Sequence, residues 1–102
     1  MIIYVAHSGN ADEVAHTINN LQINDLLNCY VSPSLTFSYL KDEQINTDAV
    51  NELWLDLLSI ADRLIVVDEK TDKIKMMIDF AKLVKMEVMR LGENGELRPF
   101  TE

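Results

Sequence analysis

The sequence predicts an α/β fold in which helices cover both faces of a four- to five-stranded, mainly parallel sheet. Short apolar runs rich in β-formers alternate along the chain with longer segments whose apolar residues recur at helical spacing. Parallel neighbours in a sheet need a crossover between them, usually a helix, and this order supplies one. A chain of 102 residues has the common size of a single core. We therefore expect one domain over residues 1–102, a three-layer sandwich of flavodoxin- or Rossmann-like arrangement.

The strands are predicted where apolar runs lie between turn residues. The run Ile2–Ala6 combines apolar residues with β-formers, which favours a buried central strand. The run Met86–Leu91 alternates, which favours a position at the edge of the sheet. The predicted strands are Ile2–Ala6, Cys29–Val31, Leu64–Val67, Met86–Leu91 and a short last one, Leu97–Phe100.

Three helices are predicted from capping residues and helical spacing. Asn10 is a suitable N-cap for the first, because its side chain can accept a hydrogen bond from the first turn of the helix. Thr47 is the expected cap of a second helix that runs to about Ile60. Thr71 or Asp72 is the expected cap of a third, which runs to about residue 84.

The segment Ser32–Thr47 is the least regular part of the chain. Pro33 disfavours helical conformation at Ser32. The segment is nevertheless too apolar for a free loop, so part of it is expected to pack over the sheet edge through Leu35, Phe37, Tyr39 and Leu40.

Composition excludes several classes of function. The net charge of −8 argues against broad binding of nucleic acids, whose affinity comes mostly from Lys and Arg on phosphates. The single cysteine, Cys29, excludes an internal disulfide and a multi-cysteine metal site. No apolar run approaches the roughly 18 residues of a membrane span, and no signal peptide is recognised at the start. We expect a cytoplasmic protein with no membrane contact, no cofactor and no metal.

The predicted topology brings three polar loops to one crevice. Ligands of open parallel sheets bind beyond the carboxyl ends of the strands, where the strand order reverses. This rule places His7–Asn10, Ser32–Phe37 and Asp68–Lys73 around the crevice. For His7 itself, two interpretations remain equally open: the side chain contacts a ligand, or it lies in a solvated turn.

Four blocks of sequence carry a resemblance to a known family. They are Ile3-Tyr4-Val5-Ala6, Val31-Ser32-Pro33-Ser34-Leu35 with Phe37-Ser38-Tyr39-Leu40, Leu55-Asp56-Leu57-Leu58 with Ala61-Asp62-Arg63-Leu64, and Met77-Ile78-Asp79-Phe80-Ala81. In their order and spacing these blocks resemble the nucleoside 2-deoxyribosyltransferase-like superfamily, in particular its short bacterial and phage members. The resemblance extends over about residues 2–90.

The chain departs from the family pattern at the residues that matter most for catalysis. The family turn usually reads Ser-x-Gly-Met before a helix that carries the Glu nucleophile. Here the turn reads Thr71-Asp72-Lys73-Ile74, and Met77 stands where the Glu is expected. Members of the family attack C1′ of a deoxynucleoside with that Glu, as in retaining glycoside hydrolysis. A thioether has no nucleophilic oxygen, so we expect this catalysis to be lost or greatly weakened.

The resemblance also implies the residues of a site. Asp56 is the implied catalytic carboxylate near the sugar, whereas Asp79 points away, because two residues turn a helix by about 200°. For Met77 the sequence leaves core packing as an alternative to a ligand contact. The implied substrate-binding residues are His7, Ser8, Gly9, Ser32, Pro33, Phe37, Asp68, Thr71, Asp72 and Met77.

Three functions follow as hypotheses. The first is a nucleoside- or nucleotide-binding protein with a deoxyribosyltransferase-like pocket that lacks the Glu. The second is an active N-glycosidase or deoxyribosyltransferase on deoxynucleosides or their monophosphates, which uses Asp56 with Asp72 or Glu69. The third is an acidic protein-interaction module, such as a phage or prophage inhibitor. By analogy with the family we expect a homo-oligomer, a dimer, that associates through the apolar loop around Phe37 and Tyr39.

Overall fold

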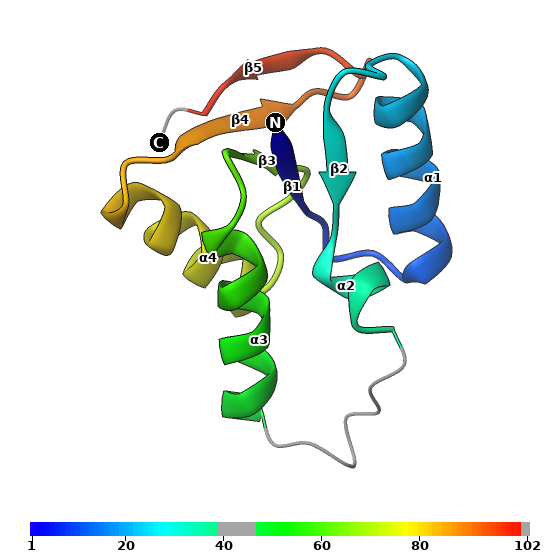
Figure 1. Ribbon diagram of the computed structural model, residues 1–102. Helices are drawn as coiled ribbons and strands as arrows, with labels where there is room; N and C mark the ends of the chain where they lie inside the picture. The colour runs from blue at the N-terminus through cyan, green and yellow to red at the C-terminus, as the bar shows by residue number, and fades with distance from the viewer. Residues whose placement is uncertain (39–46, 101–102) are drawn as a thin grey trace.

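The computed structural model describes residues 1–38 and 47–100 of the chain. These residues form a sheet with helices on both faces, as Figure 1 shows, and none of their helices is long and apolar enough to cross a membrane. In chain order the elements are β1 (Ile2–Ala6), α1 (Ala11–Ile23), β2 (Cys29–Val31), α2 (Pro33–Thr36), α3 (Thr47–Ser59), β3 (Arg63–Val66), α4 (Asp72–Leu83), β4 (Glu87–Leu91) and β5 (Leu97–Pro99).

The sheet has the strand order β2-β1-β3-β4-β5. β1 pairs in parallel with both β2 and β3, and β3 pairs in parallel with β4. β5 turns back and pairs antiparallel to β4. The predicted mainly parallel α/β sandwich of Rossmann- or flavodoxin-like arrangement is therefore confirmed. The prediction that Met86–Leu91 is an edge strand was wrong, because the hairpin adds β5 outside it.

One face of the sheet is covered by α3 and α4. Successive side chains of a strand point to opposite faces of the sheet. Tyr4 and Ala6 of β1 point to the face that α3 and α4 cover. The hydroxyl of Tyr4 donates a hydrogen bond to the Trp54 carbonyl oxygen of α3 at 3.4 Å, which ties that helix to the sheet. The buried cluster on this face consists of Tyr4, Ala6, Leu58, Leu64, Val66, Ile74, Met77, Ile78 and Ala81.

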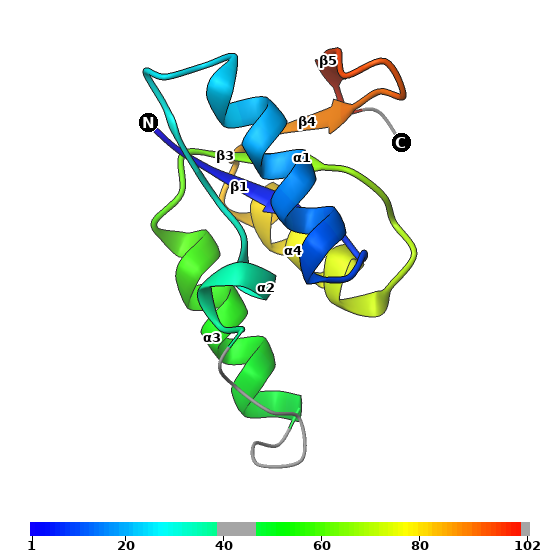
Figure 2. The same cartoon turned by 90° about the vertical axis from the view of Figure 1, so that its right-hand side faces the viewer.

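The other face carries α1, which is nearest to the viewer in Figure 2. Ile3 and Val5 of β1 point to this face and form a second buried cluster with Tyr30 and Ile65. Ile18 and Leu21 are among the partly buried side chains that pack against it, so the inner side of α1 follows the predicted helical spacing.

The helix caps agree with the local sequence. The Asn10 side chain accepts a hydrogen bond from the Glu13 backbone N–H at 2.9 Å, and the Glu13 carboxylate accepts one from the Asn10 N–H at 3.2 Å. This reciprocal capping box satisfies N–H groups that the helix itself cannot. Thr71, rather than Asp72, caps α4, because its hydroxyl accepts from the Ile74 N–H at 3.3 Å. Thr47 is the predicted cap of α3, but its side chain is not among those that the structure describes.

The segment after β2 contains a short helix that the sequence did not reveal. Ser32 is extended, with φ −143° and ψ 137°, as the residue before a proline must be. Pro33 then occupies the first turn of α2, where its missing N–H is not needed. Leu35 and Phe37 are partly buried, as predicted, whereas Tyr39 and Leu40 lie outside the described residues.

Candidate functional site

The loops after β1 and β3 meet at the carboxyl edge of the sheet. β1 has β2 on one side and β3 on the other, so the strand order reverses between these two neighbours. This is the point at which open α/β sheets bind ligands. His7, Ser8 and Gly9 follow β1, and Asp68 follows β3. The four residues form what we call the loop junction.

Asp68 holds the loop junction together. Its Oδ2 accepts a hydrogen bond from the Ser8 N–H at 3.0 Å, and its Oδ1 accepts one from the Lys70 N–H at 3.1 Å. Desolvation by itself would raise the pKa of this carboxyl, but the N–H donors of Ser8 and Lys70, together with nearby His7, lower it below its usual range. Asp68 is therefore ionised at neutral pH, and it serves as a fixed anion rather than a general acid.

His7 takes part in the same junction. Its Nδ1 accepts a hydrogen bond from the Gly9 N–H at 2.8 Å, so the neutral ring carries its proton on Nε2. Nδ1 also lies 3.7 Å from Asp68 Oδ2. A Cβ at Gly9 would lie 2.6 Å from His7 Cε1 and 3.0 Å from Glu13 Cβ. Only glycine allows the backbone to approach the imidazole this closely.

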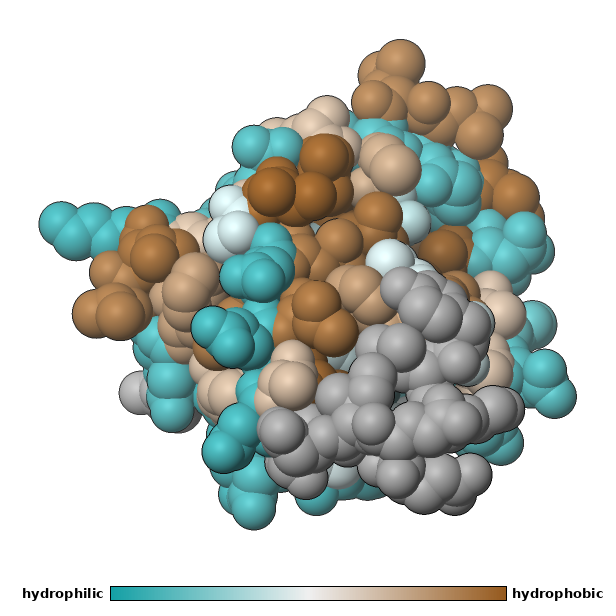
Figure 3. All heavy atoms as spheres, turned by 60° about the horizontal axis from the view of Figure 1, so that its bottom comes forward, coloured by the Kyte–Doolittle hydropathy of each residue, from teal (hydrophilic) through white to brown (hydrophobic). Residues whose placement is uncertain are grey.

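A cavity of about 260 Å³, which we call the crevice, is lined partly by the segments that follow β1, β2 and β3, but not by the four residues of the loop junction. Figure 3, which brings this side of the molecule forward, shows apolar surface at the centre of the face. The residues that line the crevice come from the first residue of α1, from α2 and its flanks, from α3 and from the first turn of α4. They are Ala11, Pro33, Ser34, Phe37, Ser38, Val50, Trp54 and Lys73.

Two aromatic side chains and one cation stand out in this lining. The Lys73 ammonium lies 4.6 Å from the centroid of the Trp54 ring, within the range of a cation–π contact. Phe37 is the second aromatic residue of the lining. Ala11 and Lys73 belong to the first turns of α1 and α4, where the positive end of the helix dipole favours an anion.

Ser32 adds a polar group next to the crevice. The residue is 2% exposed, and its Oγ has no hydrogen-bond partner within residues 1–38 and 47–100. Leaving a buried hydroxyl without a partner costs about 1–3 kcal/mol. Its neighbour Pro33 lines the crevice, whereas Ser32 itself does not.

The remaining predicted site residues lie elsewhere. Met77 is 1% exposed and belongs to the buried cluster between α4 and the sheet, so it packs in the core. Thr71 and Asp72 are exposed at the start of α4. Asp56 is exposed on α3, whereas Trp54, two residues or about 200° earlier on the helix, faces the crevice.

The structure therefore assembles part of the predicted site. It brings together His7, Ser8, Gly9 and Asp68 in the loop junction, and Pro33 and Phe37 in the crevice. It does not bring Asp56 or Met77 into the crevice lining. The sequence analysis did not single out Trp54, and only its spacing of four residues from buried Val50 and Leu58 indicates that it lies on the inner side of α3.

The crevice lining limits the chemistry available there. No carboxylate belongs to the lining among the described residues. Across the same residues, no group of three or more His, Cys, Asp or Glu side chains is placed to hold a metal ion. The lining can stack a flat ring and attract an anion, and its described residues offer no nucleophilic carboxylate oxygen.

Comparison with protein-family models and with curated proteins found no match to this chain. What can be inferred about function therefore comes from the fold, the loop junction and the crevice.

Proposed function

We propose that this protein binds a nucleoside or nucleotide in the crevice and does not transfer its sugar. The observation that supports this most directly is the pair of aromatic side chains, Phe37 and Trp54, beside the Lys73 ammonium in a cavity at the carboxyl edge of the sheet. Open α/β sheets bind their ligands at this edge.

A nucleobase suits the aromatic part of the crevice. Every base has a flat π surface that stacks on aromatic side chains, whatever its hydrogen-bonding edge. Pro33 and Val50 extend the apolar wall beside Phe37 and Trp54. The volume of about 260 Å³ is just below the range of roughly 300–1,000 Å³ usual for drug-sized ligands. This size favours a single nucleoside over a dinucleotide.

A 5′-phosphate suits the cationic part. Lys73 carries a positive charge into the lining, and Ala11 and Lys73 lie in the first turns of α1 and α4, at the positive ends of their helix dipoles. On this hypothesis a nucleoside monophosphate binds more tightly than the corresponding nucleoside.

The placement of the acidic residues favours binding over catalysis. A retaining sugar transfer needs a carboxylate that reaches C1′. Met77 lies in the core, Asp56 is exposed away from the Trp54 side of α3, and Asp68 already accepts two backbone N–H groups. None of these side chains is available for nucleophilic attack in the crevice.

Titration with deoxynucleosides and their 5′-monophosphates tests the proposal. We expect the monophosphates to raise the melting temperature of the protein more than the nucleosides do, with no free base seen by chromatography. In the variant Lys73→Met, the affinity for a monophosphate should fall about tenfold, as the loss of one charge-assisted hydrogen bond predicts. Lys75→Met is the matched control, because Lys75 is exposed on the same helix and does not line the crevice.

Three results would contradict the proposal in different ways. Equal weakening by the two lysine variants would indicate general attraction of phosphate rather than a site. Release of free base would favour an active glycosidase, whose dependence on Asp56 the variant Asp56→Asn would then test. No melting shift, together with salt-sensitive association with a basic protein, would favour the interaction module.

A further inference from the structure

The tip of the β4–β5 hairpin carries a chemically reactive pair of residues that the proposed function does not use. Asparagine is one of the thermolabile residue types, and Asn94 is the only asparagine of the chain that is followed by glycine. In such a pair the backbone nitrogen of the glycine can attack the side-chain amide carbon of the asparagine, because the second residue has no side chain that blocks the approach. Neither Asn94 nor Gly95 lines the crevice.

Both residues of the pair are accessible to water. Asn94 and Gly95 are exposed at the tip of the hairpin. A Cβ built on Gly95 would have no described atom within 4 Å. The fold therefore leaves room beside Gly95 for the change of backbone geometry that a reaction with Asn94 requires.

The hydrogen bonding of the turn sets the condition for this reaction. Gly95 has a φ of +84°, which glycine adopts without strain. Its N–H donates a hydrogen bond to the Gly92 carbonyl oxygen at 3.0 Å and so closes the turn. The nitrogen must give up this hydrogen bond before it attacks. Exposed loop tips open at low free-energy cost, so the reaction needs a local opening of the turn and not unfolding of the sheet.

Asn28 provides the contrast within the same molecule. It is followed by Cys29 of β2, whose side chain hinders attack by the backbone nitrogen. Its side-chain amide is also held at both ends. The nitrogen donates to the Asp25 carboxylate at 2.7 Å, and the oxygen accepts from the Met1 ammonium at 3.0 Å. Asn28 should therefore be much less reactive than Asn94.

We propose that Asn94 is a site of spontaneous modification, at which the chain loses ammonia and gains an aspartate or an isoaspartate. The Gly95 nitrogen loses its proton and forms a bond to Asn94 Cγ, the bond from Cγ to Nδ2 breaks, and Nδ2 takes up a proton and leaves as ammonia. Water then opens the resulting cyclic imide. Breaking the new bond to Cγ gives aspartate. Breaking the bond to the backbone carbonyl carbon of Asn94 gives isoaspartate, in which the main chain contains one additional carbon atom.

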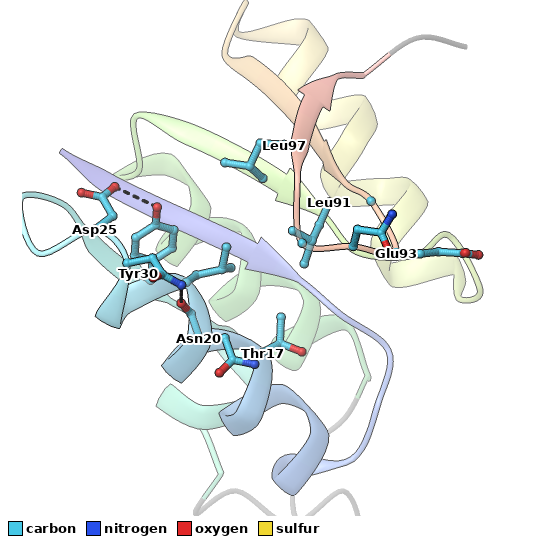
Figure 4. Close-up of a pocket in the computed structure, with 12 residues that line it drawn as sticks. Thr17, Asn20, Asp25, Tyr30, Leu91, Glu93 and Leu97 are labelled. Atoms are coloured by element: carbon cyan, nitrogen blue, oxygen red, sulfur yellow. Dashed lines mark hydrogen bonds between the residues drawn. The ribbon is translucent and has the colours of Figure 1, made fainter.

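The modification changes the hairpin and the cavity beside it. Asn94 lines a groove of about 700 Å³ between α1 and the β4–β5 hairpin, to which Leu91 and Leu97 also belong (Figure 4). Either product adds a negative charge to this lining. The isoaspartate also lengthens the turn, across which the Gly92 N–H donates to the Glu96 carbonyl oxygen at 2.7 Å. We therefore expect β5 to pair less firmly with β4 after conversion.

Incubation of the whole chain at neutral and mildly alkaline pH, followed by mass spectrometry of the tryptic peptide that begins at Leu91, tests this proposal. We expect Asn94 to gain the mass difference between an amide NH2 and a hydroxyl at least about tenfold faster than Asn28 does. The rate should rise with pH, because the nitrogen attacks after it loses its proton. Fragmentation of the peptide should show both aspartate and isoaspartate.

The isolated peptide of residues 91–97 is the comparison for the effect of the fold. If Asn94 stays intact in the whole chain while the same residue converts in the peptide, the turn protects it and the proposal is wrong. Conversion of Asn28 as fast as that of Asn94 would also overturn it. A product that contains aspartate but no isoaspartate would indicate direct hydrolysis by water instead of attack by Gly95.

Two variants of the turn test the roles of its residues separately. Gly95→Ala should slow the loss of ammonia at least about tenfold, because its methyl group hinders the attack. Alanine is strained at positive φ and can open the turn, so Asn94→Gln provides a second test. It keeps the amide but requires a larger ring, and it should slow the loss about as much. Unchanged rates in both variants would contradict the proposal. Because Asn94 lies outside the crevice, nucleotide-induced melting shifts should be the same before and after conversion.

Discussion

The carboxylate of Asp68 joins two loops that lie 60 residues apart in the chain. Its hydrogen bonds to the Ser8 and Lys70 N–H groups fix the loop after β1 against the loop after β3. Gly9 completes the arrangement, because a side chain there would collide with the His7 ring. At the scale of residues, the contact between these two loops is thus set by one anion and by one missing Cβ.

The lowered pKa of Asp68 predicts how stability depends on pH. In the unfolded chain an Asp titrates near pH 3.9, whereas in the folded chain Asp68 holds its charge to lower pH. As pH falls below about 4 the unfolded chain therefore binds protons first, so the stability that Asp68 contributes is present above this pH and is lost as pH falls through the folded pKa.

The variant Asp68→Asn should consequently show a shallower decrease in the free energy of unfolding between about pH 4 and pH 2. Urea denaturation at a series of pH values measures this slope. Asp56→Asn removes an exposed carboxylate on α3 and serves as the control for the loss of one charge. A slope in Asp68→Asn equal to that of the unmodified chain would show that the hydrogen bonds to Ser8 and Lys70 do not favour the ionised form.

At the scale of elements, local sequence controls where the helices begin. Asn10 and Glu13 form a reciprocal capping box at α1, and Thr71 caps α4. β3 shows the limit of local signals, because the strand is Arg63–Val66 rather than the predicted Leu64–Val67. Arg63 can join the strand because β1 and β4 lie on either side and pair with it.

The capping box of α1 can be tested by substitution at its cap. Asn10→Ala should lower the free energy of unfolding by about 1 kcal/mol, because N–H groups of the first turn lose their acceptor. Asn10→Ser should retain most of the stability. Asn19→Ala, in the exposed middle of the same helix, should be neutral or stabilising, since alanine is the better helix former. An unchanged unfolding midpoint in urea for Asn10→Ala would contradict the role of the cap.

At the scale of the whole molecule, the packing of the layers decides the role of Met77. Met77 is 1% exposed and packs in the cluster that joins α3 and α4 to β1 and β3. A carboxylate at this position would have to be buried without a partner or to disrupt the layer. The position is therefore structural in this chain.

Introducing a glutamate at this position should for this reason destabilise the protein without creating an enzyme. We expect Met77→Glu to lower the free energy of unfolding by more than about 3 kcal/mol, because an unpaired carboxyl enters the core. Met77→Leu should cost less than about 1.5 kcal/mol, since it conserves volume. A stable Met77→Glu variant that releases free base from deoxynucleosides would show that this side chain reaches the crevice after all.

The layers of the molecule also explain why one cavity was unexpected. The strand and helix pattern predicts helices on both faces, but it does not show how much of each face they cover. Only the assembled sheet reveals that α1 leaves a groove beside the β4–β5 hairpin. Asp25 and Glu93, which are far apart in the sequence, both belong to the lining of that groove.

Apart from the short helix α2, the sequence by itself determined which segments are helices and strands, most of their limits and the mainly parallel α/β fold class. Apolar periodicity, caps and turns act over a few neighbouring residues, so they can be recognised without the rest of the chain. The tertiary structure decided which side chains meet. Asp68 reaches Ser8, Trp54 rather than Asp56 faces the crevice, Met77 enters the core, and β5 rather than β4 forms the edge. These outcomes depend on contacts between segments far apart in the chain, whose geometry is set only when the layers pack together.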